Sequence, residues 1–103
     1  MSWRRFAVRK AEYQGNTLVN ICDEELVGKT VVEGKLKVNL SKDFYSGDNV
    51  DKGEALRLIR VCSIVNLAGK RVVSLALENQ IGAEEAVREI EGVPFLMIYK
   101  FLR

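Results

Sequence analysis

The chain has 103 residues, of which 48% are apolar and 29% charged, and this balance is typical of a globular domain rather than a disordered segment. Histidine is absent, which excludes Ser-His-Asp and Cys-His catalysis and any histidine-ligated metal. The net charge of +2 is too small to predict nucleic-acid binding by itself. We expect a single domain over residues 1–103, without metal or cofactor.

The two cysteines, Cys22 and Cys62, stand far apart, and each lies in an apolar stretch. Two such residues cannot make a zinc or iron–sulfur site by themselves, so we expect buried, reduced thiols. No apolar signal region follows Met1, and no run approaches the roughly 18 apolar residues of a membrane helix. These features predict a cytoplasmic protein without a membrane partner.

The first hairpin is predicted from two β-prone runs, residues 6–13 and 17–22, which flank a Gly-Asn turn. Residues 23–28 then predict a short helical turn. Asp23 is placed to cap its free N–H groups, and Gly28 supplies a left-handed exit.

A second hairpin is predicted over residues 29–32 and 35–40, around Glu33 and Gly34. Apolar and polar residues alternate in its second strand, which indicates one buried and one solvated face. The alternating residues are Leu36, Val38 and Leu40 against Lys35, Lys37 and Asn39. Residues 41–49 form a polar loop, in which we expect Phe44 to be a core anchor.

The first long helix is predicted to begin after Asp51, because Asp51 and Glu54 have the spacing of a capping box. An apolar stripe at helical spacing follows it, formed by Ala55, Leu58, Ile59 and Cys62. Residues 62–65 leave two alternatives open, the end of this helix or a buried strand.

A second helix is predicted over residues 67–79, with Asn66 as its N-cap and apolar residues covered on two sides. Gly69 would lie in its first turn, where glycine costs about 1 kcal/mol relative to alanine. We expect close packing, or a ligand near the backbone, to compensate for that cost.

The third hairpin is predicted over residues 87–90 and 95–102, with Pro94 at the bend or first strand position. Its last strand is almost entirely apolar, which is typical of a central strand buried on both faces. The predicted class is α+β: a mostly antiparallel sheet of about six short strands in three hairpins. Two helices are inserted before the last hairpin and pack to one side.

One candidate site lies at the start of the second helix, where free N–H groups and the helix dipole favour an anion. Its residues are Asn66, Gly69, Lys70 and Arg71. The alternative is an ordinary N-cap followed by basic surface residues.

A second candidate site is an RNA-contacting surface of basic and aromatic side chains. Its residues are Trp3, Arg4, Arg5, Arg9, Lys10, Lys35, Lys37 and Tyr45. The alternatives are a solvated strand face for Arg9 and Lys10, edge protection for Lys35 and Lys37, and plain packing for Tyr45.

Catalysis would need a nucleophile or a base with an activator beside it. The available groups are Asp23, Glu24, Tyr45, Cys62, Ser63 and Lys70, and none has a recognisable activator in the sequence. We therefore favour a protein that is not an enzyme, while a small enzyme or nucleotide-binding protein with a site at residues 66–71 remains an alternative.

Several short motifs, in this order and spacing, resemble a small archaeal family, the domain-of-unknown-function family numbered 424. The motifs are Cys22-Asp-Glu-Glu-Leu-Val-Gly-Lys-Thr30, Phe44-Tyr45-Ser46-Gly47, Asn66-Leu-Ala-Gly69, Val73-x-Leu-Ala76 and Gly92-Val-Pro94. The resemblance covers nearly the whole chain and implies an archaeal cytoplasmic protein. It carries no assigned activity, cofactor or catalytic residue.

Taken together, the sequence favours a non-enzymatic binding module whose partner is RNA or a ribonucleoprotein, such as a translation-associated complex. We expect a salt-dependent interaction with structured RNA. A protein–protein assembly module is the further alternative, including a homodimer that forms through the terminal strand.

Overall fold

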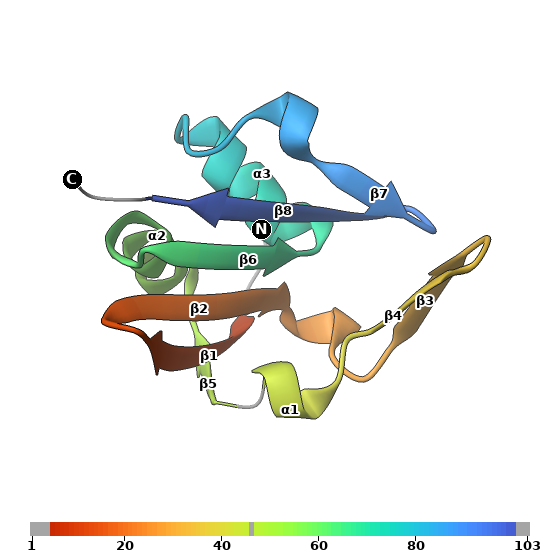
Figure 1. Cartoon of the computed structure of the whole chain (residues 1–103), viewed down its shortest axis with the longest axis horizontal. Helices are drawn as coiled ribbons and strands as arrows, with labels where there is room; N and C mark the ends of the chain where they lie inside the picture. The colour runs from red at the N-terminus through yellow and green to blue at the C-terminus, as the bar shows by residue number, and fades with distance from the viewer. Residues whose placement is uncertain (1–4, 46, 101–103) are drawn as a thin grey trace.

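A six-stranded sheet organises the chain, in the order β5-β1-β2-β6-β8-β7, and gives it the predicted α+β class (Figure 1). The computed structural model describes residues 5–45 and 47–100. The six strands are β1 (Phe6–Tyr13), β2 (Asn16–Asp23), β5 (Asp48–Val50), β6 (Ile64–Ala68), β7 (Arg88–Ile90) and β8 (Val93–Tyr99). A separate hairpin joins β3 (Thr30–Glu33) and β4 (Leu36–Asn39). The helices are α1 (Lys42–Tyr45), α2 (Lys52–Val61) and α3 (Lys70–Glu78), with short 3₁₀ turns η1 (Glu24–Leu26) and η2 (Glu84–Ala86).

All three predicted hairpins are present: β1 with β2, β3 with β4, and β7 with β8. The first turn centres on Gln14 and Gly15, and the last on Glu91 and Gly92; all four residues have positive φ. Two-residue turns of this kind match the right-handed twist of paired strands, and glycine at the second position adopts them without strain.

Strand β6 follows helix α2 and precedes helix α3 along the chain, and this strand corrects the prediction made for Asn66. Residues 64–68 pair in parallel with β2 and antiparallel with β8, so Asn66 is in the middle of a strand and is not a helix N-cap. The following helix begins at Lys70 rather than at residue 67. Val65 and Leu67 are buried between two strands and the helices, and this burial outweighs a capping tendency.

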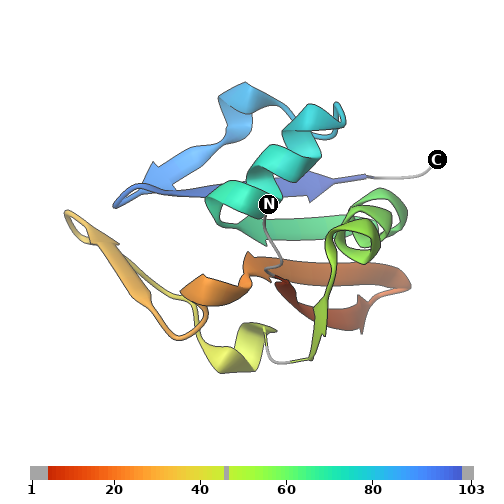
Figure 2. The same ribbon diagram turned by 180° about the vertical axis from the view of Figure 1, so that it is seen from behind.

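The terminal strand β8 is not the fully buried central strand that its composition predicted. Strand β7 pairs only with Val93–Phe95, and β8 continues beyond it to Tyr99. Met97 and Tyr99 are 53% and 54% exposed. The reason is that α2 and α3 both cover the same face of the sheet (Figure 2). The other face, which is toward the viewer in Figure 1, carries no helix beside β8 in the described part of the chain.

The covered face holds the main core, in which apolar residues of β2 and β6 pack against the two helices. Its fully buried members include Val19, Ile21, Val65, Ile59 and Val72. Burying each such side chain contributes about 1.5–3 kcal/mol, so this face accounts for most of the favourable packing.

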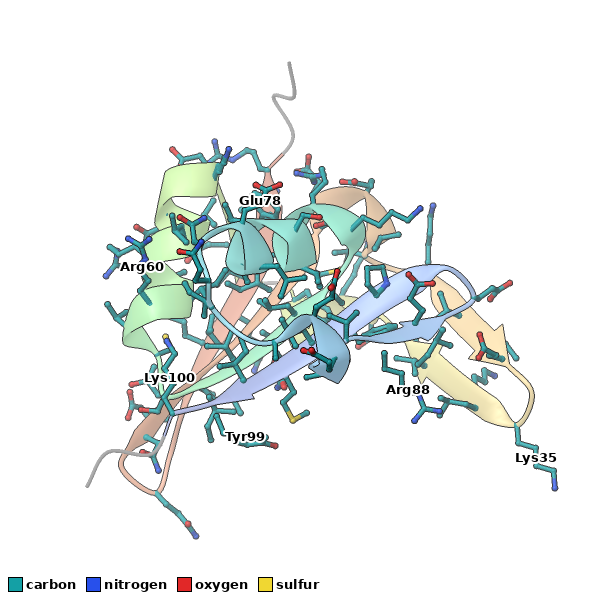
Figure 3. The ribbon with its side chains drawn as sticks, turned by 90° about the horizontal axis from the view of Figure 1, so that it is seen from above. Lys35, Arg60, Glu78, Arg88, Tyr99 and Lys100 are labelled. Atoms are coloured by element: carbon teal, nitrogen blue, oxygen red, sulfur yellow. The ribbon has the colours of Figure 1, made fainter. Side chains whose placement is uncertain are left out.

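The opposite face, which we call the open face, is only partly covered. Cys22 and Ala68 pack there under Leu40, with Tyr45 and Phe95 against them. Along the rest of the open face, side chains of β6, β7 and β8 point away from α2 and α3, as Arg88 and Tyr99 do in Figure 3.

Some predictions fall on parts of the chain that the structure does not describe. Trp3, Arg4 and Ser46 lie outside the described residues, as do residues 101–102 of the predicted last strand. The side chain of Phe44 is likewise outside the described part.

Candidate functional site

The start of helix α3 is occupied by a side chain of the protein itself. The Asp23 carboxylate accepts hydrogen bonds from the backbone N–H groups of Arg71 and Val72, each at 2.9 Å. Asp23 is 2% exposed and comes from the end of β2. The predicted anion position at this helix start is therefore filled by an internal carboxylate, which complements the positive helix end.

Asp23 was expected to cap the short turn that follows it, and this expectation is wrong. The 3₁₀ turn η1 has no side-chain hydrogen bond at its N-terminal cap. The carboxylate instead reaches α3 because β2 and β6 lie side by side and both end near that helix (Figure 1). Burial raises the pKa of Asp23, while the two amide hydrogen bonds and the Arg71 charge act in the opposite direction.

Gly69 is explained by the same carboxylate. Its φ of +121° lies outside the range that side chains favour. A Cβ at this position would lie 2.4 Å from both Cγ and Oδ2 of Asp23. From the sequence, either close packing or a ligand near the backbone was expected to compensate for the cost of Gly69. Close packing against Asp23 is present, and it leaves no room for a ligand at the Gly69 Cα.

Arg71 is held by the protein as well. Its guanidinium donates to both carboxylate oxygens of Glu25, at 2.6 and 3.0 Å, and to the carbonyl of Arg5 at 2.9 Å. It lies over the Phe6 ring, 4.6 Å from the centroid. The hydrogen-bonded Glu25 raises the pKa of Arg71, which stays charged.

The four residues of the anion-site prediction therefore do not come together. Lys70 and Arg71 line a hollow of about 480 Å³ with Asp23, whereas Asn66 lines a different cavity on the open face. Side chains alternate along a strand, so Asn66 points away from the helix that it was expected to cap.

The cavity on the open face has a volume of about 420 Å³ and brings together residues from seven elements, β2, β4, α1, β6, η2, β7 and β8. The residues that matter for its chemistry are Asn20, Tyr45, Asn66, Arg88, Phe95 and Met97. Asn20, Asn66 and Met97 are neighbours across β2, β6 and β8, and Arg88 is opposite Phe95. The register of the sheet thus places an amide pair beside aromatic and thioether side chains.

The amide pair is joined by a hydrogen bond from Asn66 Nδ2 to Asn20 Oδ1 at 2.9 Å. The other amide oxygen, Asn66 Oδ1, is buried and accepts no hydrogen bond from the described residues. Tyr45 lies at the edge of the same cavity, and burial raises the pKa of its hydroxyl to about 12. The site is therefore uncharged in its interior and has one unsatisfied acceptor.

Of the RNA-contact candidates, only some share this face. Arg9 is opposite Asn20 and so belongs to the open face, while Lys10 is opposite Val19 on the helix side. Arg5 is exposed and donates to the carbonyl of Asn49.

Lys35 and Lys37 are exposed on the β3–β4 hairpin, with Lys35 at its tip (Figure 3). The sequence did not identify Asn20 and Arg88 as residues of the site. Only the register of paired strands brings them to the cavity, and no local pattern carried that information.

The two cysteine thiols are not activated as nucleophiles. Burial raises the pKa of the Cys62 thiol, and it raises that of Cys22 to about 12. Both cysteines are buried as predicted, in separate clusters on opposite faces. Among residues 5–45 and 47–100, no three His, Cys, Asp or Glu side chains gather as metal ligands.

Comparison with known proteins identifies the family. Residues 11–101 match the family model described as "Protein of unknown function (DUF424)". An uncharacterized conserved protein from Methanopyrus kandleri, known from a crystal structure, shares the fold: the TM-score is 0.83 at 22% identity, over 96% of this chain and 94% of that one. No curated protein matches. None of the helices in the described part of the chain is long and apolar enough to cross a membrane. With nearly its whole length matched, the chain belongs to the DUF424 family.

Proposed function

We propose that the protein is a non-enzymatic module that binds RNA, with unpaired bases lying on the open face. The observation that carries the proposal is the cavity of about 420 Å³ on a sheet face that the two long helices leave uncovered. We also infer that it works in the cytoplasm of an archaeon. The shared fold of the protein from Methanopyrus kandleri supports the archaeal origin.

The first support is the kind of side chain on this face. Phe95, Tyr45 and Met97 line the cavity, and Met97 and Tyr99 are both exposed along β8. Sheet surfaces that present aromatic side chains bind single-stranded RNA by stacking, because every base has a flat π-face. An exposed apolar surface of this composition is better suited to the flat faces of bases than to phosphate groups.

The second support is the distribution of cations. Arg88 and Arg9 share the open face through the strand register. Arg88 makes no ion pair within the described part of the chain, and Arg9 donates to the carbonyl of Asp43 at 2.9 Å, which leaves its charge unneutralised. On the helix side, Arg57 and Arg71 are paired with Glu54 and Glu25, while Lys10 and Arg60 supply the matched cations for a control. Cations that are not neutralised internally can contact phosphates and release counterions.

The alternatives receive less support. An enzyme would need an activated group, and the two thiols have raised pKa values in a chain without histidine. An anion or nucleotide site at residues 66–71 would need the first N–H groups of α3, which donate to Asp23.

The test is binding of a fluorescent single-stranded RNA to two charge-matched double variants at about 50 mM salt and above. Arg9→Glu with Arg88→Glu changes the open face, while Lys10→Glu with Arg60→Glu changes the helix side by the same charge. We expect the first variant to bind about tenfold or more weakly and the control to bind within about twofold of wild type. The salt slope of the first variant should be smaller by about 1.4, because each arginine that no longer binds a phosphate lowers the slope by about 0.7.

Two outcomes would contradict the proposal. One is that wild-type protein binds no RNA at the low salt concentration. The other is that both double variants lose affinity equally, since binding would then depend on total charge and not on the open face.

A further inference from the structure

We infer that the cavity on the open face takes one adenine base of the bound RNA, held by the Asn20–Asn66 amide pair. This inference rests on the proposed RNA binding and names the part of the ligand that the cavity would recognise. It is carried by the unsatisfied acceptor of Asn66, a residue that lines the cavity, and by the cavity's apolar walls, its size and the arginine among its lining residues.

The first supporting feature is the unsatisfied acceptor Asn66 Oδ1. Asn66 Oδ1 is shielded from solvent and has no donor within the described residues. A buried acceptor without a donor is unfavourable, so an occupant that supplies an N–H group gains affinity here. The exocyclic amino group of adenine is such a donor.

The orientation of the amide adds a second contact. Asn66 Nδ2 uses one hydrogen for Asn20 Oδ1, and an amide nitrogen carries two. Asn66 therefore combines an acceptor with a second donor hydrogen. Asparagine recognises adenine through this pair, accepting from N6 and donating to N7. Asn20 fixes the amide orientation and is a positioning residue in this scheme.

The walls and the volume favour a flat base. Tyr45, Phe95 and Met97 give the cavity aromatic and thioether surfaces on which a purine ring can pack. Its volume of about 420 Å³ is at the small end of ligand sites, which suits one base and excludes a stack of several.

Arg88 supplies a binding group for the phosphate of the nucleotide. Arg88 lines the cavity from β7, beside Phe95, and its side chain is exposed. A guanidinium binds a phosphate through two parallel hydrogen bonds. A base that packs on the aromatic side chains lining the cavity would keep its backbone phosphate on the solvent side, where the exposed Arg88 side chain can bind it.

The experiment compares three ligands on the unchanged protein, followed by NMR of the asparagine side-chain amides. The ligands are adenosine monophosphate, the purine ribonucleotide that lacks the amino group, and ribose 5-phosphate. We expect adenosine monophosphate to shift the Asn20 and Asn66 amide signals saturably. The purine analogue should bind about tenfold more weakly or worse, because one good base contact is worth about that factor. Ribose 5-phosphate should leave the signals unchanged.

A variant series gives the matching result on the protein side. Asn66→Val keeps a β-prone side chain and removes the unsatisfied acceptor, so the fold should persist while adenosine monophosphate binding falls about tenfold or more. Asn16→Ala, at the start of the same strand as Asn20, is the control and should bind normally. Equal binding of all three ligands, or normal binding by Asn66→Val, overturns the inference.

An adenine-containing RNA and the same RNA with abasic positions separate this inference from the proposed function. Binding of both RNAs with equal affinity overturns the adenine site and leaves RNA binding in place. Saturable binding of adenosine monophosphate without binding of either RNA supports the base site and overturns the proposed function. If neither RNA nor mononucleotide binds, both are wrong.

Discussion

Asp23 and Gly69 depend on each other although they are 46 positions apart in the sequence. The buried carboxylate satisfies two N–H groups of α3, and it reaches them only because the residue before the helix has no side chain. Leaving those buried N–H groups unsatisfied would cost about 1–3 kcal/mol each. The pair therefore joins the end of β2 to the start of α3.

Substitution of Gly69 by alanine should strongly destabilise the protein. We expect a loss of about 3 kcal/mol or more in the free energy of unfolding, from the strained φ and from the clash with Asp23. Gly53→Ala is the control, since a Cβ there meets only Asp51 Oδ1 at 3.6 Å. That change should raise stability by up to about 1 kcal/mol, because alanine is the better helix former. Urea unfolding followed by circular dichroism measures both, and equal effects would refute the role of Gly69.

Helix α2 is the clearest example of an element stabilised at both ends. At its start, Asp51 Oδ1 accepts from Glu54 N at 2.9 Å, as the sequence predicted. At its end, the Lys100 ammonium group donates to the carbonyls of Ile59 and Arg60. Burial lowers the pKa of Lys100, because it disfavours the charged ammonium group. Part of the favourable contact between this charge and the helix end therefore only compensates for the desolvation of the ammonium group.

Loss of the start cap can be measured directly. Asp51→Ala should lower the free energy of unfolding by about 1 kcal/mol, because the N–H of Glu54 loses its acceptor. Asp51→Asn should retain most of the stability, since asparagine caps a helix about equally well. If the alanine and asparagine variants unfold at the same urea concentration, the hydrogen bond does not contribute as described.

For the molecule as a whole, the decisive feature is that both long helices cover one face of the sheet. The open face then exposes Met97 and Tyr99 along the part of β8 that extends beyond β7. An apolar surface of this kind is also suited to a second copy of the chain. We propose homodimer formation through the terminal strand as the alternative use of this face, in competition with RNA.

This alternative predicts a reversible dimer. Light scattering should show a mass that rises with concentration from 11.6 kDa toward twice that value. Met97→Lys should shift the protein toward the monomer, because a charge on a buried apolar interface is unfavourable. Val61→Lys is the control, since Val61 is 61% exposed on the helix side. A constant monomer mass at all concentrations would exclude the dimer.

Local patterns in the sequence determined the α+β class, the three hairpins and the cap of α2. Alternation, turn residues and caps act over a few residues, so a single stretch such as residues 35–40 contains the information. The tertiary structure alone decided that Asn66 belongs to a strand. The same Asn-Leu-Ala-Gly stretch has the local pattern of a helix start.

The candidate site was the least predictable part for the same physical reason. Tyr45 was named from the sequence as a pocket or stacking residue, and Asn66 as a polar residue of interest, but as part of a helix start. Asn20 and Arg88 join them only through the pairing of β2 with β6 and of β7 with β8. Strand pairing between distant segments is set by burial of the whole core, and no stretch of the chain carries it alone.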